Sequence, residues 1–274
     1  MAEVNAERPP AQRTCPRLVV VWNSSDDPVV PEAGGVVTFD GRLSVDEMHA
    51  YVTLRMVGHR GPGSTSLARH LVTEFAGSDA MLAEELMSLS HDDLLNLPQS
   101  LSRIAPPTGG GVLSVAAGAV DGLGDSVQDW LTSRSAGSES VKARERLDSR
   151  YWRACVRALL PWLEERRRPV IEILRSSLED YLYPSGGKWR KVLPWRPNET
   201  LTVEIDDLEF NDVVAMSRHA NDPFVPLDAI AQQALEACRS SKRVRDALAH
   251  MRPPASVDVQ NVIRLLDILL PCGG

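Results

Sequence analysis

The feature that most constrains the fold of this chain is a long run of helical periodicity over residues 141–183. Apolar residues recur there every three or four positions, which places them on one side of an α-helix. They are Trp152, Val156, Leu159, Leu160, Leu163, Ile171, Leu174, Leu178 and Leu182. We expect Pro161 and Pro169 to kink the segment or to split it into consecutive helices, because proline cannot donate the internal hydrogen bond.

Further helix signals follow and extend a predicted helical bundle over residues 141–271. An alternating pattern at residues 201–205 (LTVEI) predicts one short strand. Capping residues and prolines mark the ends of the other expected helices, at residues 206–219, 226–238, 242–251 and 257–270.

The N-terminal part carries a different pattern. Residues 17–22 (RLVVVW) and 35–39 (GVVTF) are apolar runs that predict short strands. A capping box at Ser44 and Glu47 predicts a helix that ends near residue 57. More helices are expected at residues 66–75, 79–89 and 91–97, with Pro98 ending the last one. Residues 17–105 are therefore predicted to form a mixed α/β region after a disordered tail at residues 1–16.

A stretch rich in Gly, Ser and Ala at residues 106–140 separates the two parts. Such a composition favours a mobile linker that holds at most one or two weak helices. The predicted fold is thus mainly α, with a small N-terminal β element and a C-terminal helical bundle.

Composition excludes several classes of protein. The net charge of −7 opposes binding of duplex nucleic acid over a broad face. The four cysteines, Cys15, Cys155, Cys238 and Cys272, lack CxxC spacing, so we expect neither structural zinc nor a disulfide framework, and we expect a reducing cytoplasm. No segment approaches the roughly 20 apolar residues that cross a bilayer, and the first residues lack a signal-peptide core. No membrane contact, metal or cofactor is predicted.

Residues 58–65 (GHRGPGST) match a phosphate-binding loop except that Ser64 replaces the lysine. That lysine carries much of the electrostatic attraction for the β and γ phosphates. A true phosphate loop also follows a strand, whereas the capping box at Ser44 predicts a helix before Gly58. The alternative interpretation is a connector between helices.

The pair Arg245 and His250 is the main candidate for a catalytic site, with Asp246 beside it. Five positions on a helix place two residues roughly 140° apart around the axis, so both can address one groove if the helix end is distorted or a partner closes over it. An arginine that neutralises a phosphate and a histidine that moves a proton suit metal-free RNA cleavage by the 2′-hydroxyl. The alternative is a solvated helix end whose cations complement the helix dipole.

The stretch Arg245, Asp246 and His250, with Leu248 and Ala249 before the histidine, resembles the motif of HEPN-domain ribonucleases and HEPN-like helical domains. The resemblance covers at most the C-terminal half of the chain. It implies a helical bundle, and in active members it implies an RNA-cleaving pair brought together with a second pair in a homodimer. Asp246 departs from the asparagine or histidine that is frequent at its position, and it adds a negative charge beside the expected phosphate.

Two further groups of charged residues are candidates for binding. A basic set with one tryptophan predicts a nucleic-acid contact, or else solvated surface with the tryptophan packed on its own domain; it comprises Lys242, Arg243, Lys188, Trp189, Arg190 and Lys191. The basic run at residues 166–168, with Arg175, belongs to the same hypothesis. An acidic set at residues 204–212 has the chemistry of a metal site, but its position at a helix start is explained by capping.

These observations lead to three functional hypotheses. The first is a non-catalytic helical interaction module of a bacterial multi-protein assembly, such as an antiviral or toxin-type conflict system, a setting that the HEPN-like resemblance alone implies. Other protein subunits are the expected partners, and RNA is a further candidate. The second hypothesis is a metal-independent ribonuclease that uses Arg245 and His250, and the third is a degenerate nucleotide-binding regulator at residues 58–65.

Overall fold

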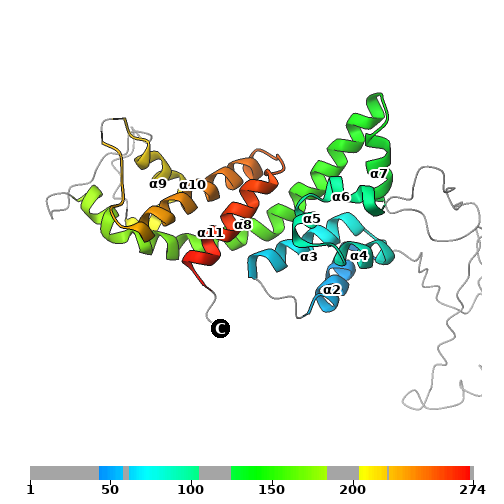
Figure 1. Cartoon of the computed structure of the whole chain (residues 1–274), viewed down its shortest axis with the longest axis horizontal. Helices are drawn as coiled ribbons and strands as arrows, with labels where there is room; N and C mark the ends of the chain where they lie inside the picture. Colours follow the sequence, from blue (N-terminus) through cyan, green and yellow to red (C-terminus); the bar gives the residue numbers. More distant parts are fainter. Residues whose placement is uncertain (1–42, 58–61, 105–124, 184–203, 221, 272–274) are drawn as a thin grey trace, which may run out of the picture. The chain divides into compact units, whose positions relative to one another are not determined.

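The computed structural model of this chain describes residues 43–57, 62–104, 125–183, 204–220 and 222–271. All regular elements in these ranges are helices, which confirms a mainly α fold (Figure 1). They are α2 (Val45–Arg55), α3 (Pro62–Ala76), α4 (Ala80–Met87), α5 (His91–Leu95), α6 (Leu97–Ile104), α7 (Asp125–Ser133), α8 (Ser138–Leu182), η3 (Ile205–Asp207), α9 (Phe210–Ser217), α10 (Ala229–Ala249) and α11 (Ser256–Leu269). The strands predicted at residues 17–22 and 35–39 lie outside the described residues.

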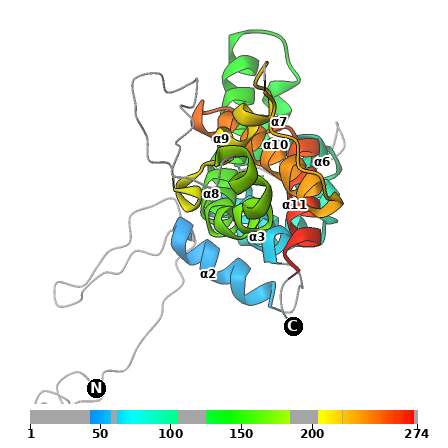
Figure 2. The same cartoon turned by 90° about the vertical axis from the view of Figure 1, so that its left-hand side faces the viewer.

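Helix α8, with 45 residues, connects the other helices. Helices α3, α7 and α10 all pack against it, and α11 packs on α10 (Figure 1). Helix α2 packs on α3 and α4 and lies at the margin of the group (Figure 2). The predicted apolar side of α8 is confirmed, because Leu159, Leu174 and Leu178 are fully buried. No helix within the described ranges combines the length and apolarity that crossing a membrane requires.

Helix α8 passes through Pro161 and Pro169 without a break, so of the two predicted alternatives, a kink or a split, the split is wrong. Each proline removes the hydrogen bond to the carbonyl four residues earlier. Those carbonyls belong to Arg157 and Glu165, and all four residues lie on the exposed side, where water can solvate the carbonyls. The buried residues on either side of the prolines pack into one core, and this packing keeps the helix continuous.

Local signals set the N-terminal helices. The Ser44 hydroxyl accepts the Glu47 N–H at 3.3 Å, and the Glu47 carboxylate accepts the Ser44 N–H at 2.8 Å, which confirms the predicted capping box. Asp79 caps α4. Pro98 does not end a helix as predicted; α5 ends at Leu95 and Pro98 lies in the first turn of α6, where the missing N–H costs no bond.

The segment predicted as a linker contains packed structure in its described part. Helix α7 and the start of α8 occupy residues 125–140, and α7 lies against α8. The Ser126 hydroxyl donates to the Phe75 carbonyl at the end of α3, and buried Asp129 accepts from Arg146 at 2.7 Å. Polar contacts of this kind leave no apolar periodicity, so composition alone did not reveal them. Residues 106–124 lie outside the described ranges.

Two predictions about the C-terminal elements are corrected. The helices expected at residues 226–238 and 242–251 form one helix, α10, which is capped by Asp228. Ser240 and Ser241, at the expected break, are buried inside it, because small side chains allow close packing of helices. Ile205 begins the 3-10 helix η3 rather than ending a strand, and residues 201–203 of that predicted strand lie outside the described residues.

Candidate functional site

Arg245 lies in the last turns of α10, and His250 is the residue that ends this helix. The helix closes with two backbone bonds, from the Met251 N–H to the Leu248 carbonyl at 3.1 Å and from the Arg252 N–H to the Ala247 carbonyl at 2.9 Å. This pattern is a Schellman motif, in which the first residue after the helix cap adopts a left-handed conformation. Met251 does so here, with φ of 54°. The backbone around the predicted catalytic pair is therefore fixed by ordinary helix termination.

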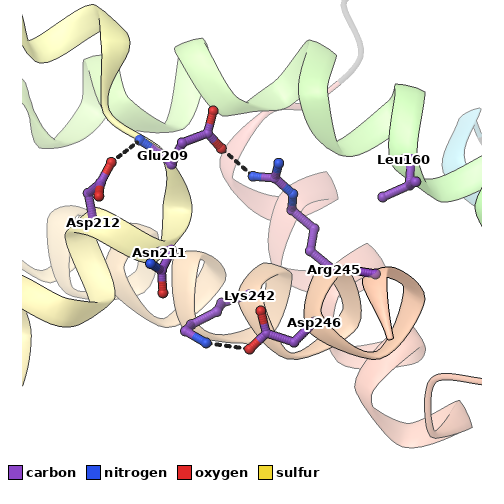
Figure 3. A pocket seen from close by; sticks show the side chains of 8 residues that line it. Leu160, Glu209, Asn211, Asp212, Lys242, Arg245 and Asp246 are labelled. Atoms are coloured by element: carbon purple, nitrogen blue, oxygen red, sulfur yellow. Dashed lines mark hydrogen bonds and ion pairs between the residues drawn. The ribbon is translucent and has the colours of Figure 1, made fainter. Parts of the chain in front are cut away.

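A surface hollow of about 480 Å³ lies beside Arg245, between α8, α9 and α10 (Figure 3). Its lining consists of Leu160, Glu209, Asn211, Asp212, Lys242, Arg245, Asp246 and Ala249. The start of α9 contributes Glu209, Asn211 and Asp212 to this lining, and Phe210 between them is buried in the core. The hollow thus contains two of the three predicted catalytic residues.

Arg245 is already paired with a carboxylate in this hollow. Its guanidinium donates to Glu209, and the two side chains are similarly half-buried, with 35% and 36% of their surface exposed (Figure 3). Glu209 also lies 3.9 Å from the guanidinium of Arg167 on α8. The pairing joins α10 to the start of α9, so Arg245 has a structural role in this arrangement.

The second cation of the hollow is also neutralised. Lys242 forms an ion pair with Asp246, one turn later on the same helix. Asp212 accepts the Glu209 N–H at 2.9 Å and so completes a capping box at the start of α9 (Figure 3). Each cation in the lining is therefore already paired with a carboxylate, so an incoming phosphate would have to displace a carboxylate from Lys242 or Arg245.

His250 is exposed and is not among the residues that line the hollow. The reason is helix geometry, because a separation of about 140° points Arg245 and His250 to different sides of α10. The structure therefore brings Arg245, Asp246 and Lys242 together and leaves His250 outside the hollow. Asp246, the residue that departs from the HEPN-like pattern, accepts a hydrogen bond from Lys242.

The residues predicted to contact nucleic acid do not lie together either. Arg243 donates to Asp258 on α11 at 2.9 Å and to Ser240 at 3.0 Å, so it joins α10 to α11. Lys242 belongs to the hollow. The remaining members of the set, Lys188, Trp189, Arg190 and Lys191, lie outside the described residues.

The arginines of α8 also hold the fold together. Arg167 is buried and donates to the Asp206 carbonyl at 3.1 Å and to the Leu208 carbonyl at 3.0 Å. Arg166 stacks on Trp162, with 4.4 Å between the guanidinium carbon and the ring centroid. Arg175 pairs with Asp206. These contacts give Arg166, Arg167 and Arg175 structural roles, whereas Arg168 is exposed.

The acidic set at residues 204–212 shows no metal geometry. Within the described ranges, no group of three or more possible ligands has an arrangement that would hold an ion. Asp206, Glu209 and Asp212 instead contact Arg175, Arg245 and the start of α9.

The loop at residues 58–65 lacks the context of a phosphate-binding loop. Helix α2 ends at Arg55 and α3 begins at Pro62, so a helix stands where a nucleotide-binding loop requires a strand. The condition for a degenerate nucleotide-binding regulator is therefore not met. Gly58 to Gly61 lie outside the described residues.

Sequence reasoning missed the residue that fixes the end of α10. The indole of Trp152 on α8 donates to the Leu248 carbonyl at 2.9 Å, between the two predicted catalytic positions. The periodicity of α8 identified Trp152 as a core residue but gave no sign of this bond, since its partner lies 96 positions away.

Comparison with known proteins gives no relative on which to test these assignments. No family model, no curated protein and no solved structure matches the chain.

Proposed function

We propose that this chain is a non-catalytic helical module that acts by binding another protein subunit. The observation that carries the proposal is the ion pair between Arg245 and Glu209. A phosphate at Arg245 would have to displace the Glu209 carboxylate, which Arg245 already binds. The arginine that an RNA-cleaving site needs is thus committed to joining α9 and α10.

A protein partner is supported by exposed apolar side chains near the start of α10. Val225, Leu227 and Ile230 expose 63%, 92% and 61% of their surface. Large apolar side chains grouped on a surface are common where proteins bind one another. The wider setting, a bacterial multi-protein assembly of the antiviral or toxin type, rests on the HEPN-like resemblance and is part of this proposal.

Metal-independent RNA cleavage is the second candidate function. The observation in its favour is that Arg245 and His250 occupy the end of one helix, with His250 exposed to solvent. Cleavage would require a second copy or an RNA strand to displace Glu209 and to bring both side chains to one phosphate.

The two functions are separated by incubating the purified full chain with mixed RNA in EDTA, beside the variant His250→Ala. We expect no cleavage by either protein. Cleavage by the wild type that disappears in His250→Ala would replace our proposal with the ribonuclease.

Partner binding is tested by recovering the tagged chain from its native cells. The variant Leu227→Asp places a charge on the apolar group, and Leu54→Asp is its matched control, because Leu54 is 73% exposed on α2. We expect a partner in stoichiometric amount with the wild type and Leu54→Asp, and its loss from Leu227→Asp. Recovery of the wild type with no such partner would contradict the proposal.

A further inference from the structure

Two histidines from different helices stack on each other away from the α9–α10 hollow. His49 of α2 and His70 of α3 have ring centroids 4.5 Å apart and ring planes inclined by 15°. The His49 Nδ1 lies 3.3 Å from the Thr73 hydroxyl oxygen, and that hydroxyl donates its proton to the Arg69 carbonyl at 2.8 Å. His49 must therefore donate from Nδ1, which leaves Nε2 without a proton in the neutral ring.

Cations from two helices act on this pair. Arg69 of α3 and Arg157 of α8 lower the affinity of the rings for a proton. Glu74 of α3 would favour protonation, but Arg153 and Arg157 bind its carboxylate at 2.8 Å and 2.5 Å, and only 7% of its side chain is exposed. The carboxylate is thus largely neutralised within the same cluster.

Asp46 and Glu84 are further charged groups on α2 and α4. Asp46 of α2 weakly favours a protonated His49. Glu84 of α4 is bound by Arg55 and Tyr51 of α2, with 2.8 Å between the Arg55 Nε and the carboxylate. The side of α2 that faces α4 is therefore held by a separate ion pair.

Protonation of either ring works against this packing. Burial, followed by the charges of Arg69 and Arg157, lowers the pKa of His49. Burial, followed by His49 and Arg157, lowers the pKa of His70 to about 4. A pKa lowered by folding means that the unfolded or opened segment takes up the proton first, so the stabilisation is complete at neutral pH and declines as pH falls from about 6.5 toward the folded value.

We propose that the stacked His49 and His70 form an acid-sensitive contact, in which neutral rings hold α2 on α3 and proton uptake releases α2. The release exposes Met48, Val52 and Met56, which are 0%, 0% and 4% exposed in the folded chain. Mild acid would in this way uncover an apolar surface on α2 and α3 while α10 and α11 keep their packing. The inference does not depend on the proposed partner binding.

The test is hydrogen exchange of the full chain at about pH 7 and about pH 5, corrected for the intrinsic pH dependence of exchange. We expect protection of the α2 amides to fall by about tenfold at the lower pH relative to the α10 amides. A histidine with different pKa values in the packed and the released state shifts the equilibrium between these states by about this factor. The double variant His49→Gln, His70→Phe cannot take up the protons and should lose this response. His219→Gln, at the end of α9, is the control histidine and should keep it.

A titration of the wild-type chain keeps the inference testable if the double variant does not fold. The imidazole resonances of His70 should report a midpoint well below that of a free histidine, and they should shift together with signals from α2. A His70 midpoint near about 6.5, the value of an unperturbed histidine, would overturn the inference. Equal loss of protection in α2 and α10 would overturn it as well.

Discussion

Replacing Arg167 with methionine removes a buried guanidinium while keeping most of the aliphatic part of the side chain. Two backbone carbonyls at the entry to α9 then lose their donor, that of buried Leu208 and that of partly exposed Asp206. An unpaired buried polar group costs about 1–3 kcal/mol, and removing the buried charge recovers part of its desolvation cost. The bond to Glu164 adds little because 53% of that side chain is exposed. We expect a loss of about 3 kcal/mol in the free energy of unfolding.

The measurement is urea unfolding followed by circular dichroism, where about 3 kcal/mol corresponds to a midpoint lowered by about 1 M. Arg168→Met is the matched control, because Arg168 is the exposed neighbour on the same helix and its loss should change stability by less than about 0.5 kcal/mol. Equal midpoints for the two variants would refute the structural role of Arg167. If the dependence of the free energy of unfolding on urea concentration changed in Arg167→Met alone, the start of α9 would instead detach as a separate unit.

Two smaller effects test the end of α10. Met251→Gly should stabilise the chain by about 0.5–1 kcal/mol, because glycine adopts the left-handed φ of 54° without steric cost, and thermal unfolding would detect an increase; an unchanged or lower melting temperature would contradict the assigned Schellman motif. Trp152→Phe should cost about 1 kcal/mol through the lost bond to the Leu248 carbonyl, and faster hydrogen exchange confined to the last turn of α10 would identify that bond as the cause.

The parts of the fold that were predicted correctly depend on neighbours in sequence. The capping box at Ser44 and the apolar side of α8 are set by residues within one or two turns, so a local pattern reveals them. The split at Pro161, one of two predicted alternatives, does not occur, because the penalty of a proline is local, whereas α8 also packs against α3 and α10. The break expected between residues 238 and 242 is absent for the same reason, since Ser240 and Ser241 are buried within α10.

The candidate site could be located but not interpreted from sequence. Arg245 and Asp246 were found because helix spacing suffices to place them together. Their partners were not all found, since Glu209 lies 36 positions before Arg245 and no local pattern joins the two. The histidine pair was missed because His49 and His70 show neither ligand spacing nor triad spacing in the sequence, and only the packing of α2 on α3 stacks them.

Arg167 in the arginine run of α8 and Arg245 at the end of α10 have the same kind of structural role. An arginine placed for nucleic acid has to present its guanidinium to solvent, where phosphates compete only with water. Arg167 and Arg245 instead direct theirs to backbone carbonyls and to Glu209, which lies close to both. Acidic side chains outnumber basic ones, and they supply a partner at each of these positions. The negative net charge and the arginine-rich helix therefore have the same explanation, which is that charge pairs join the helices. The surfaces that these pairs leave open include the exposed apolar group around Leu227, where we propose that a partner binds.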